Sequence, residues 1–234
     1  MKSTIQDKEG LVNSVFSKVY KKYDLMNDIM SLGIHRIWKN KFIEWMNPQP
    51  NDNLIDVASG TGDIAKLFSK KNNHLNNISC VEPNNEMLSV GKFNLRNLSN
   101  IKWYKASGEN LPFNNDNYDF YSISYGIRNV SDINLTLKEA FRVLKPGGRF
   151  MCLEFSKINN ELLNLFYQQY SKTIPLIGKY VVGTSKPYDY LIKSINEFYS
   201  QEELVDLMKT NGFSNIEYRN LSNGISAIHS GWKI

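Results

Sequence analysis

Short apolar runs alternate with longer amphipathic stretches through the middle of the chain. Brief, almost continuous apolar runs are typical of strands buried on both faces of a parallel sheet. Because helix-like stretches separate several of these runs, we expect a doubly wound α/β fold with right-handed crossovers. The expected strands are 53–58, 78–82, 101–105, 119–125 and 148–155. The expected helices are 62–70, 83–93 with Pro83 in its first turn, and 132–144 with Asp132 as N-cap.

The C-terminal region changes this pattern. Ser200-Gln-Glu-Glu203 is a capping box that opens a helix, and Gly212 is placed to end it. Two further strands, 215–221 and 225–231, are joined by Ser222-Asn223-Gly224, and Asn-Gly favours a tight hairpin. We therefore expect a seven-stranded, mostly parallel, Rossmann-like sheet that ends in an antiparallel hairpin.

Two segments lie outside the alternation of strand and helix. Residues 10–46 are expected to form N-terminal helices, and residues 158–199 are too apolar for a plain loop. The second segment is interpreted as a helical insertion, either a lid over a hydrophobic substrate or an ordinary packed element. We treat residues 1–234 as one domain that contains both.

A glycine-rich loop follows the first expected strand. It runs Asp56-Val-Ala-Ser-Gly60-Thr61-Gly62-Asp63 and opens a helix. Glycines let the backbone turn sharply and let a ligand approach closely, and sheets of this kind bind ligands at the carboxyl ends of their strands. The spacing also fits the dinucleotide fingerprint, so the loop alone leaves a nicotinamide oxidoreductase as an alternative.

The residues around the loop favour a cationic cofactor. A pyrophosphate needs a free helix N-terminus, whereas Asp56 and Asp63 flank this loop with negative charge. S-adenosylmethionine carries a sulfonium and an ammonium group. Glu82 ends the second strand, where a carboxylate can accept the two ribose hydroxyls. The polar stretch Ser107–Phe113 follows the third strand and could bond an adenine edge, with Leu111 and Phe113 as walls. Leu144-Lys-Pro-Gly-Gly148 is interpreted as a structural turn before the fifth strand.

Charge and composition exclude some classes of protein. The net charge is +5, and residues 1–41 carry eight Lys/Arg against four Asp/Glu. This excess fits either contact with an anionic membrane or a solvated helix surface; the absence of a dense basic run argues against nucleic acid. The two cysteines, Cys80 and Cys152, lack metal-ligand spacing, and no metal is expected. The first ten residues have no apolar run of the kind found in signal peptides.

With these motifs in place, the chain resembles the ubiquinone/menaquinone biosynthesis C-methyltransferase family of the class I S-adenosylmethionine-dependent methyltransferases. The resemblance extends from about residue 14 to the C-terminus. The segments that carry it are Tyr23–Asp28, Ser31–Trp38, Tyr125–Val130, Leu153–Ser156 and Asn223–His229. Two departures are minor: Glu82 stands where Asp is frequent, and Ser59 replaces a small residue.

The resemblance implies methylation of a ring carbon on a polyprenylated quinol. It places cofactor contacts at Thr61, Glu82, Ser107, Gly108 and Ser124, with Asp56, Gly60 and Gly62 shaping the loop. It also points to Arg128, Asn129 and Tyr23 as catalytic or substrate-contacting residues. Because arginine keeps its proton, we expect Arg128 to stabilise a developing phenolate or orient a water rather than act as a direct base. His35 is a candidate base, although a histidine beside Trp38 is more often structural.

Several alternatives stay open at this point. The acceptor could be the ubiquinone precursor 2-methoxy-6-polyprenyl-1,4-benzoquinol, which we favour, or demethylmenaquinol, or both. A methyltransferase with another acceptor and a non-catalytic, cofactor-binding assembly subunit are further alternatives. The resemblance also implies peripheral membrane contact and homodimerisation. We expect a cytoplasmic protein at the inner membrane, or a mitochondrial-matrix protein if the chain is a processed mature form.

Overall fold

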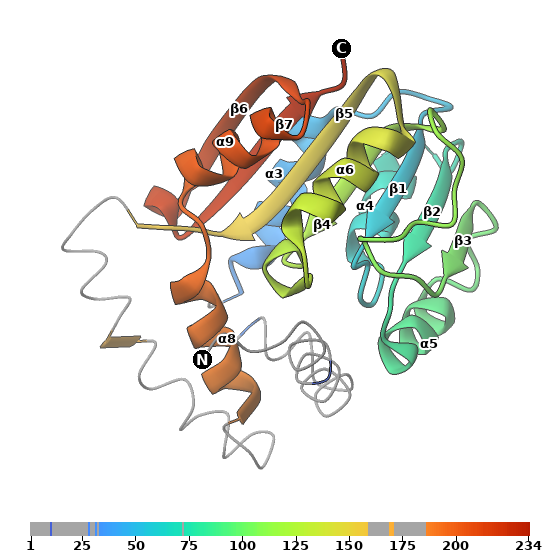
Figure 1. The fold of residues 1–234 in the computed structure, drawn as a ribbon. Coiled ribbons are helices and arrows are strands. Elements are labelled where there is room, and N and C mark those ends of the chain that lie inside the picture. Colours follow the sequence, from blue (N-terminus) through green and yellow to red (C-terminus); the bar gives the residue numbers. More distant parts are fainter. Residues whose placement is uncertain are drawn as a thin grey trace.

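The computed structural model describes residues 33–71, 73–158 and 186–234, with the single positions Gly10, Asp28, Ser31, Gln169 and Tyr170. These residues form one sheet with helices on both faces (Figure 1). The strands are β1 (Asn53–Val57), β2 (Asn77–Val81), β3 (Ile101–Tyr104), β4 (Tyr118–Ser124), β5 (Leu144–Phe155), β6 (Ser214–Leu221) and β7 (Ser226–Trp232). The helices are α3 (His35–Met46), α4 (Asp63–Lys71), α5 (Asn85–Asn94), α6 (Ile133–Val143), α8 (Lys186–Glu197) and α9 (Gln201–Thr210), with short 3₁₀ turns η2 (Ile127–Asn129) and η3 (Ser222–Gly224).

The sheet has the doubly wound topology that the sequence predicts. Its seven strands run in the order β3-β2-β1-β4-β5-β7-β6. The chain passes outward from β1 to β3 and then returns to β4 on the other side of β1, which pairs in parallel with both β2 and β4. Ligands of such sheets bind at this reversal of direction, outside the carboxyl ends of the strands. The loops after β1 and β4 therefore mark where to look for a site.

The C-terminal unit is confirmed in detail. β7 pairs antiparallel with both β5 and β6. Ser200 and Glu203 form the predicted capping box on α9. At the other end of α9, the amide of Gly212 donates to Lys209 and the amide of Phe213 donates to Met208, while Gly212 has a φ of +96°. This is a Schellman ending, in which glycine takes the left-handed position that other residues avoid.

Two local predictions are wrong. Pro83 precedes α5 rather than lying in its first turn, because the side chain of Asn84 accepts from the Met87 amide and caps the helix one residue later. The Pro-Gly-Gly stretch is not a turn before β5 but a bulge inside it: Leu144 pairs with Tyr118, and the register then shifts so that Arg149 pairs with Phe120. Gly147, at a φ of +79°, allows the extra residues to fold out of the ladder.

Apolar side chains fill the space on each face of the sheet. On one face α3 and α4 contribute Phe42 and Phe68, which pack on Leu54 and Ile78. On the other face Leu137 of α6 and the buried α9 side chains Leu204 and Met208 pack on the strand side chains that point to that face. Such near-continuous apolar strands are expected where both faces are covered. Tyr188, Leu191 and Ile195 of α8 are also buried, so this part of the predicted insertion packs onto the fold.

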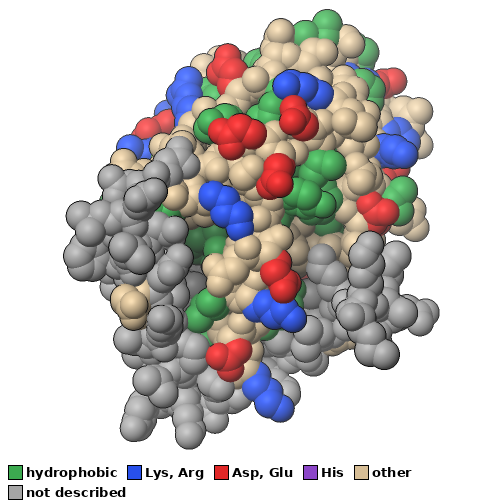
Figure 2. Space-filling view, turned by 60° about the vertical axis from the view of Figure 1, so that its left-hand side comes forward, with side chains coloured by type: hydrophobic (Ala, Val, Ile, Leu, Met, Phe, Trp, Pro, Cys, Tyr) green, Lys and Arg blue, Asp and Glu red, His purple; other side chains and the backbone are tan. Residues whose placement is uncertain are grey.

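The outer segments are described only in part. α3 and α8 confirm helical structure at the ends of the 10–46 and 158–199 predictions, and the remainder of each falls largely outside the described residues. None of the helices in the described part of the chain is long and apolar enough to span a membrane. On the face shown in Figure 2, acidic and basic side chains are interspersed, and the described residues there present no continuous basic area.

Candidate functional site

The glycine loop after β1 is held by a carboxylate from the end of β2. The amide of Gly60 donates to Oε2 of Glu82 at 2.9 Å, and the amide of Asn84 donates to Oε1 at 2.9 Å. Ala58, Gly60 and Gly62 all have positive φ values, of 52°, 55° and 89°. Glu82 is 7% exposed, and burial raises the pKa of its carboxyl to about 6. The loop and the expected ribose acceptor are thus one hydrogen-bonded unit.

Gly62 is required by both conformation and space. Its φ of +89° is disfavoured for side-chain-bearing residues, and a Cβ there would lie 2.6 Å from Cδ1 of Leu95 and 3.2 Å from the Trp103 ring. Gly108, in the loop after β3, is similarly enclosed: a Cβ would lie 3.1 Å from Thr136 and 3.2 Å from Val57. Glycine at both positions lets neighbouring segments approach closely.

The two acids that flank the loop differ in their surroundings. Asp56 is 1% exposed; its Oδ1 accepts from Ser122 at 2.6 Å and its Oδ2 has no partner. Burial raises the pKa of Asp56 to about 7. Asp63 accepts from Nζ of Lys39 at 2.6 Å; burial opposes its ionisation, but Lys39 keeps its pKa below the ordinary value. Asp63 therefore adds no unbalanced negative charge to the loop, because Lys39 already balances it.

The polar loop after β3 is tied to the start of α6. Ser107 and Asn110 form an isolated bridge, and Oε1 of Glu109 accepts from the Ser131 amide at 2.7 Å. Leu111 is buried in the core on the α6 face. The ring of Phe113 packs edge-on against Tyr104 at the end of β3 and Tyr118 at the start of β4, with ring centroids 4.8 and 5.3 Å apart.

The turn after β4 touches the glycine loop. A Cβ on Gly126 would lie only 2.5 Å from Cβ of Ala58. The two loops can therefore touch only because position 126 has no side chain. Tyr125 adopts a left-handed φ of 55° at this point. The side-chain hydroxyl of Ser124, the last residue of β4, is buried and has no hydrogen-bond partner. Arg128 and Asn129 follow directly in η2, which brings the predicted catalytic pair beside the predicted cofactor loop.

Arg128 forms a buried ion pair that the sequence did not predict. Its Nη1 lies 2.5 Å from Oε1 of Glu154, with side chains 4% and 1% exposed, and it also donates to the Tyr125 carbonyl at 2.8 Å. Nε of Arg128 and Oε2 of Glu154 have no partner. Burial raises the pKa of Glu154, although Arg128 opposes that rise. The one sequence feature that pointed to this ion pair was Glu154 itself, a charged residue within the otherwise apolar end of β5.

Asn129 is linked to α8. The hydroxyl of Tyr190 donates to Oδ1 of Asn129 at 3.0 Å, and Nδ2 of Asn129 donates to the Tyr125 carbonyl at 3.3 Å. Tyr190 was also missed, because only the fold brings a residue 61 positions away against η2. The amide side chain is therefore fixed from two sides.

Four of the nine buried polar atoms that lack a hydrogen-bond partner among the described residues lie at this end of the sheet. They are Asp56 Oδ2, Ser124 Oγ, Arg128 Nε and Glu154 Oε2. Buried polar groups normally have partners, and exceptions at one locus indicate a polar ligand. These atoms, beside a glycine loop that Glu82 holds in place, fit an adenosyl cofactor that carries amino and carboxyl groups.

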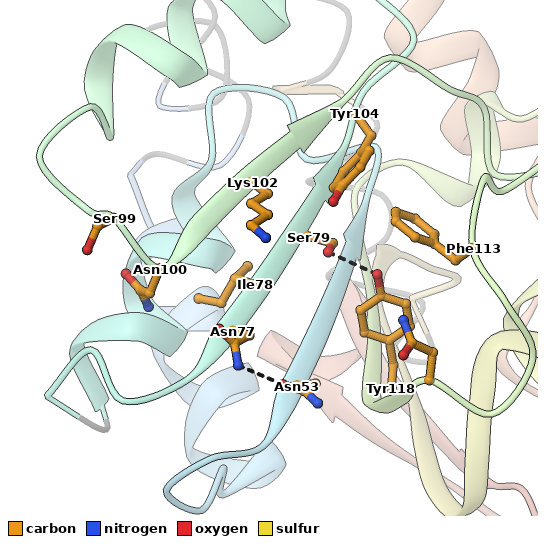
Figure 3. A pocket seen from close by; sticks show the side chains of 11 residues that line it. Asn53, Asn77, Ile78, Ser79, Ser99, Asn100, Lys102, Tyr104, Phe113 and Tyr118 are labelled. Carbon is orange, nitrogen blue, oxygen red and sulfur yellow. Dashed lines mark hydrogen bonds between the residues drawn. The ribbon is translucent and has the colours of Figure 1, made fainter.

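A separate cavity lies over the beginnings of the outer strands. It encloses about 270 Å³ between Asn53, Asn77, Lys102, Tyr104 and Tyr118 (Figure 3). Its polar groups bond one another: Tyr118 donates to Ser79 at 2.9 Å, and Asn77 donates to Asn53 at 3.3 Å. In the described part of the chain, none of the buried polar atoms without a partner belongs to the lining of this cavity. The cofactor end, rather than this cavity, is therefore the candidate active site.

Two sequence-predicted candidates remain, Tyr23 and His35. Tyr23 falls outside the described residues, and its role stays a prediction. His35 is 3% exposed and shares a 2.9 Å hydrogen bond with Ser31. Burial, with help from Lys39, lowers the pKa of His35 to about 4, so its imidazole is neutral at ordinary pH. These contacts favour the structural interpretation of His35.

Solved structures share this fold. A SAM-dependent methyltransferase from Thermotoga maritima matches with a TM-score of 0.68 at 20% identity, over 95% of this chain and all (100%) of that one. A phosphoethanolamine N-methyltransferase from Haemonchus contortus, solved with S-adenosylhomocysteine, matches with a TM-score of 0.61 at 12% identity, over 84% of this chain and 52% of that one. At these identities the likeness concerns the fold alone.

Sequence relatives are much closer. The chain is 52% identical to a protein from Rickettsia bellii and 50% identical to one from Rickettsia prowazekii, in each case over 97% of this chain and 94% of the relative. Both are named ubiquinone/menaquinone biosynthesis C-methyltransferase. The model of the ubiE/COQ5 methyltransferase family matches residues 2–233. The chain therefore belongs to the ubiE/COQ5 methyltransferase family, and it is an enzyme that uses S-adenosylmethionine.

Proposed function

We propose that the protein methylates a ring carbon of a polyprenylated quinol, with the ubiquinone precursor 2-methoxy-6-polyprenyl-1,4-benzoquinol as the favoured acceptor and demethylmenaquinol as a second one. The observation that carries this proposal is the position of Arg128 and Asn129, in the turn that contacts the glycine loop. Near-full-length relatives at about half identity, named for ubiquinone and menaquinone biosynthesis, support it.

On the cofactor side of the site, Glu82 accepts the ribose hydroxyls, Thr61 contacts the cofactor, and Asp56, Gly60 and Gly62 shape the glycine loop. Ser107, Gly108 and Ser124 complete the contacts. S-adenosylmethionine supplies a methyl group on a sulfonium, and the chain's contribution is to hold that group in line with the acceptor carbon. The unpaired oxygen of Asp56 and the unpaired hydroxyl of Ser124 support this placement.

The acceptor side must increase the electron density of the ring. A neutral quinol carbon is a weak nucleophile, and loss of the neighbouring hydroxyl proton raises its reactivity. The guanidinium of Arg128 stabilises the resulting phenolate, and Asn129 orients the oxygen or a water bound to it. Tyr23 is assigned to the substrate as well. Removing one such preorganised donor costs about 10²–10³ in rate in comparable sites.

The test is lipid analysis of cells that lack the gene. Accumulation of the demethylated benzoquinone precursor supports the ubiquinone branch, accumulation of demethylmenaquinone alone moves the acceptor to the other branch, and accumulation of neither refutes the proposal. In vitro, Arg128→Ala should lose turnover while it keeps its affinity for S-adenosylhomocysteine. Retained turnover would refute the role of Arg128.

Two secondary proposals concern the membrane and the oligomeric state. We expect contact with the surface of the membrane that holds the quinol, and the family resemblance leads us to propose homodimerisation. Co-sedimentation with anionic vesicles tests the first, and light scattering tests the second. Protein that stays in the supernatant, or that scatters as a monomer, refutes the respective proposal.

A further inference from the structure

The charge on Arg128 is already matched inside the protein. Glu154, at the carboxyl end of β5, pairs with it at 2.5 Å, and both side chains are almost fully buried. A guanidinium that only stabilised a phenolate would need no such carboxylate, and the carboxylate reduces the positive charge that a phenolate would meet. The presence of Glu154 therefore needs a separate explanation.

The pair also leaves an unused acceptor and an unused donor. Oε2 of Glu154 and Nε of Arg128 have no hydrogen-bond partner, although both atoms are buried. Oε1 already accepts from Arg128 and from the Phe155 amide at 2.9 Å. An unpaired buried donor or acceptor costs free energy, so such atoms indicate a group that arrives during function. A carboxylate oxygen can accept from a phenolic hydroxyl, and a guanidinium N–H can donate to a phenolate oxygen.

Resting on the proposed function, we propose that Glu154 is the proton acceptor of the methyl-transfer reaction, taking the acceptor's hydroxyl proton onto Oε2 while Arg128 exchanges its carboxylate partner for the phenolate. The O–H bond of the quinol breaks, its electron pair stays on the ring oxygen, and an O–H bond forms on Glu154. The cluster begins and ends this step with the same total charge. A low-dielectric site favours a transfer that creates no net charge.

The remaining protons also balance. When the ring carbon has gained the methyl group, the ring is a neutral dienone that still carries the hydrogen of that carbon. Glu154 returns its proton to the ring oxygen, and the carbon's proton leaves to solvent. The carboxylate is thereby restored, and the whole reaction releases one proton, which comes from carbon.

The surroundings of Glu154 suit this role. Burial raises its pKa, which makes the carboxylate a stronger base than an exposed one. Among the described residues, the other titratable groups with an electrostatic interaction with the pair are Tyr190 of α8 and Cys152 of the same strand. Burial raises the pKa of both, so they stay neutral at ordinary pH and leave Arg128 as the balancing charge.

The first experiment compares the wild type with Glu154→Gln on two acceptors. One is the parent prenylated hydroquinone, and the other is a ring-fluorinated analogue with a more acidic hydroxyl. Because general-base catalysis contributes about 10²–10⁴-fold, we expect the variant to be slower than wild type by at least about 100-fold on the parent. The deficit should shrink on the acidic analogue, and also as pH rises. An equal deficit on both acceptors at every pH would overturn the proposal.

Controls separate this effect from damage to the fold and from failure of the proposed function. Titration of S-adenosylhomocysteine shows whether the variant keeps its cofactor site. Asp116→Asn removes the carboxylate of another ion pair, with Lys233 at 2.7 Å, and should keep wild-type rates on both acceptors. If the wild type itself methylates neither hydroquinone, the proposed acceptor is wrong irrespective of Glu154.

A second measurement uses only wild-type protein, because Glu154→Gln leaves Arg128 as an unbalanced buried charge and thereby destabilises the fold. A nitrophenol is added, in the presence of S-adenosylhomocysteine, at a pH where the free phenol is protonated. We expect phenolate absorbance on binding, with no proton released to the buffer, because Glu154 retains the proton. Calorimetry in two buffers of different ionisation enthalpy counts the released protons. Phenolate formed with release of one proton, or phenol bound without ionising, would overturn the assignment.

Discussion

Tyr190 on α8 donates a hydrogen bond of 3.0 Å to the side-chain oxygen of Asn129, in the turn that follows β4. A segment beyond the fifth strand is thereby attached to the predicted methyl-acceptor site. The same turn contacts the glycine loop through Gly126 and Ala58. One short 3₁₀ turn therefore connects the cofactor side, the acceptor side and α8.

Tyr190→Phe should weaken the acceptor side selectively. The change removes one hydrogen bond, with a net contribution of about 0.5–1.5 kcal/mol. We expect kcat/KM for the quinol to fall by roughly two- to tenfold, with S-adenosylhomocysteine affinity unchanged, as measured by steady-state kinetics and calorimetry. Tyr188→Phe is the matched control, because Tyr188 is buried on the same helix and its hydroxyl has no partner. Equal losses in the two variants would show that the hydrogen bond has no special role.

Glu82→Gln should weaken cofactor binding. Glu82 accepts from two backbone amides at 2.9 Å, and an amide side chain can replace only one of those acceptors. Because hydrogen bonds to charged groups are worth about 1.5–3 kcal/mol, we expect S-adenosylhomocysteine affinity to fall by roughly 10- to 100-fold in calorimetric titration.

Asp63→Asn is the comparison for Glu82→Gln. The carboxylate of Asp63 is bound to Lys39 at 2.6 Å, so we expect its loss to lower thermal stability and to leave cofactor affinity within about threefold. A large loss of affinity in Asp63→Asn would restore the hypothesis that this acid faces the cofactor. An unchanged affinity in Glu82→Gln would remove Glu82 from the cofactor site.

Asp56 should make the stability of the protein depend on pH. Burial raises its pKa to about 7 in the folded state, from 3.8 for an ordinary aspartate. Between these two values the folded protein binds the proton more tightly than the unfolded chain, so this contribution destabilises the fold as pH rises from about 4 to 7. The slope can reach at most about 1.4 kcal/mol per pH unit.

Asp56→Asn should remove that dependence. The asparagine oxygen can still accept from Ser122, and the side chain no longer ionises. We expect the variant to gain stability relative to wild type as pH rises through that window, measured by urea unfolding without cofactor at several pH values. Parallel curves for the two proteins would mean that Asp56 titrates in the ordinary range. Asp206→Asn, an exposed position on α9, is the control.

Gly62→Ala should destabilise the protein more than Gly147→Ala. Both glycines have positive φ, of 89° and 79°, but a Cβ at Gly62 would lie 2.6 Å from Leu95, whereas nothing lies within 4 Å at Gly147. The left-handed conformation costs alanine about 1–2 kcal/mol at either position. Crowding should add roughly 1–3 kcal/mol at Gly62 alone. Chemical unfolding measures both losses, and equal values would show that Leu95 and Trp103 move aside.

Local sequence determined much of this fold. The alternation of apolar runs and helices predicted the strands within a few residues, and the capping signals of α6 and α9 were confirmed at Asp132 and Ser200. These signals act between residues close in sequence, so they can be recognised without the fold. Prediction failed at two places. Asn84 competed with Pro83 locally and capped α5 one residue later, and pairing of Leu144 with the distant Tyr118 of β4 placed Pro-Gly-Gly within β5 as a bulge.

The sequence also indicated the cofactor class and the family, because the glycine loop and the motif at residues 125–130 are each contiguous in sequence, and Glu82 directly follows the strand after the loop. Only the tertiary structure decided how charges are paired. Lys39 meets Asp63 across 24 positions, Arg128 meets Glu154 across 26, and Tyr190 reaches Asn129 across 61. No periodicity specifies such partners, since they are set by which strand ends and helix faces the sheet topology places together. That pairing decided which acids are balanced, and it left Glu154 and Asp56 as the buried carboxylates with an unpaired oxygen among the described residues.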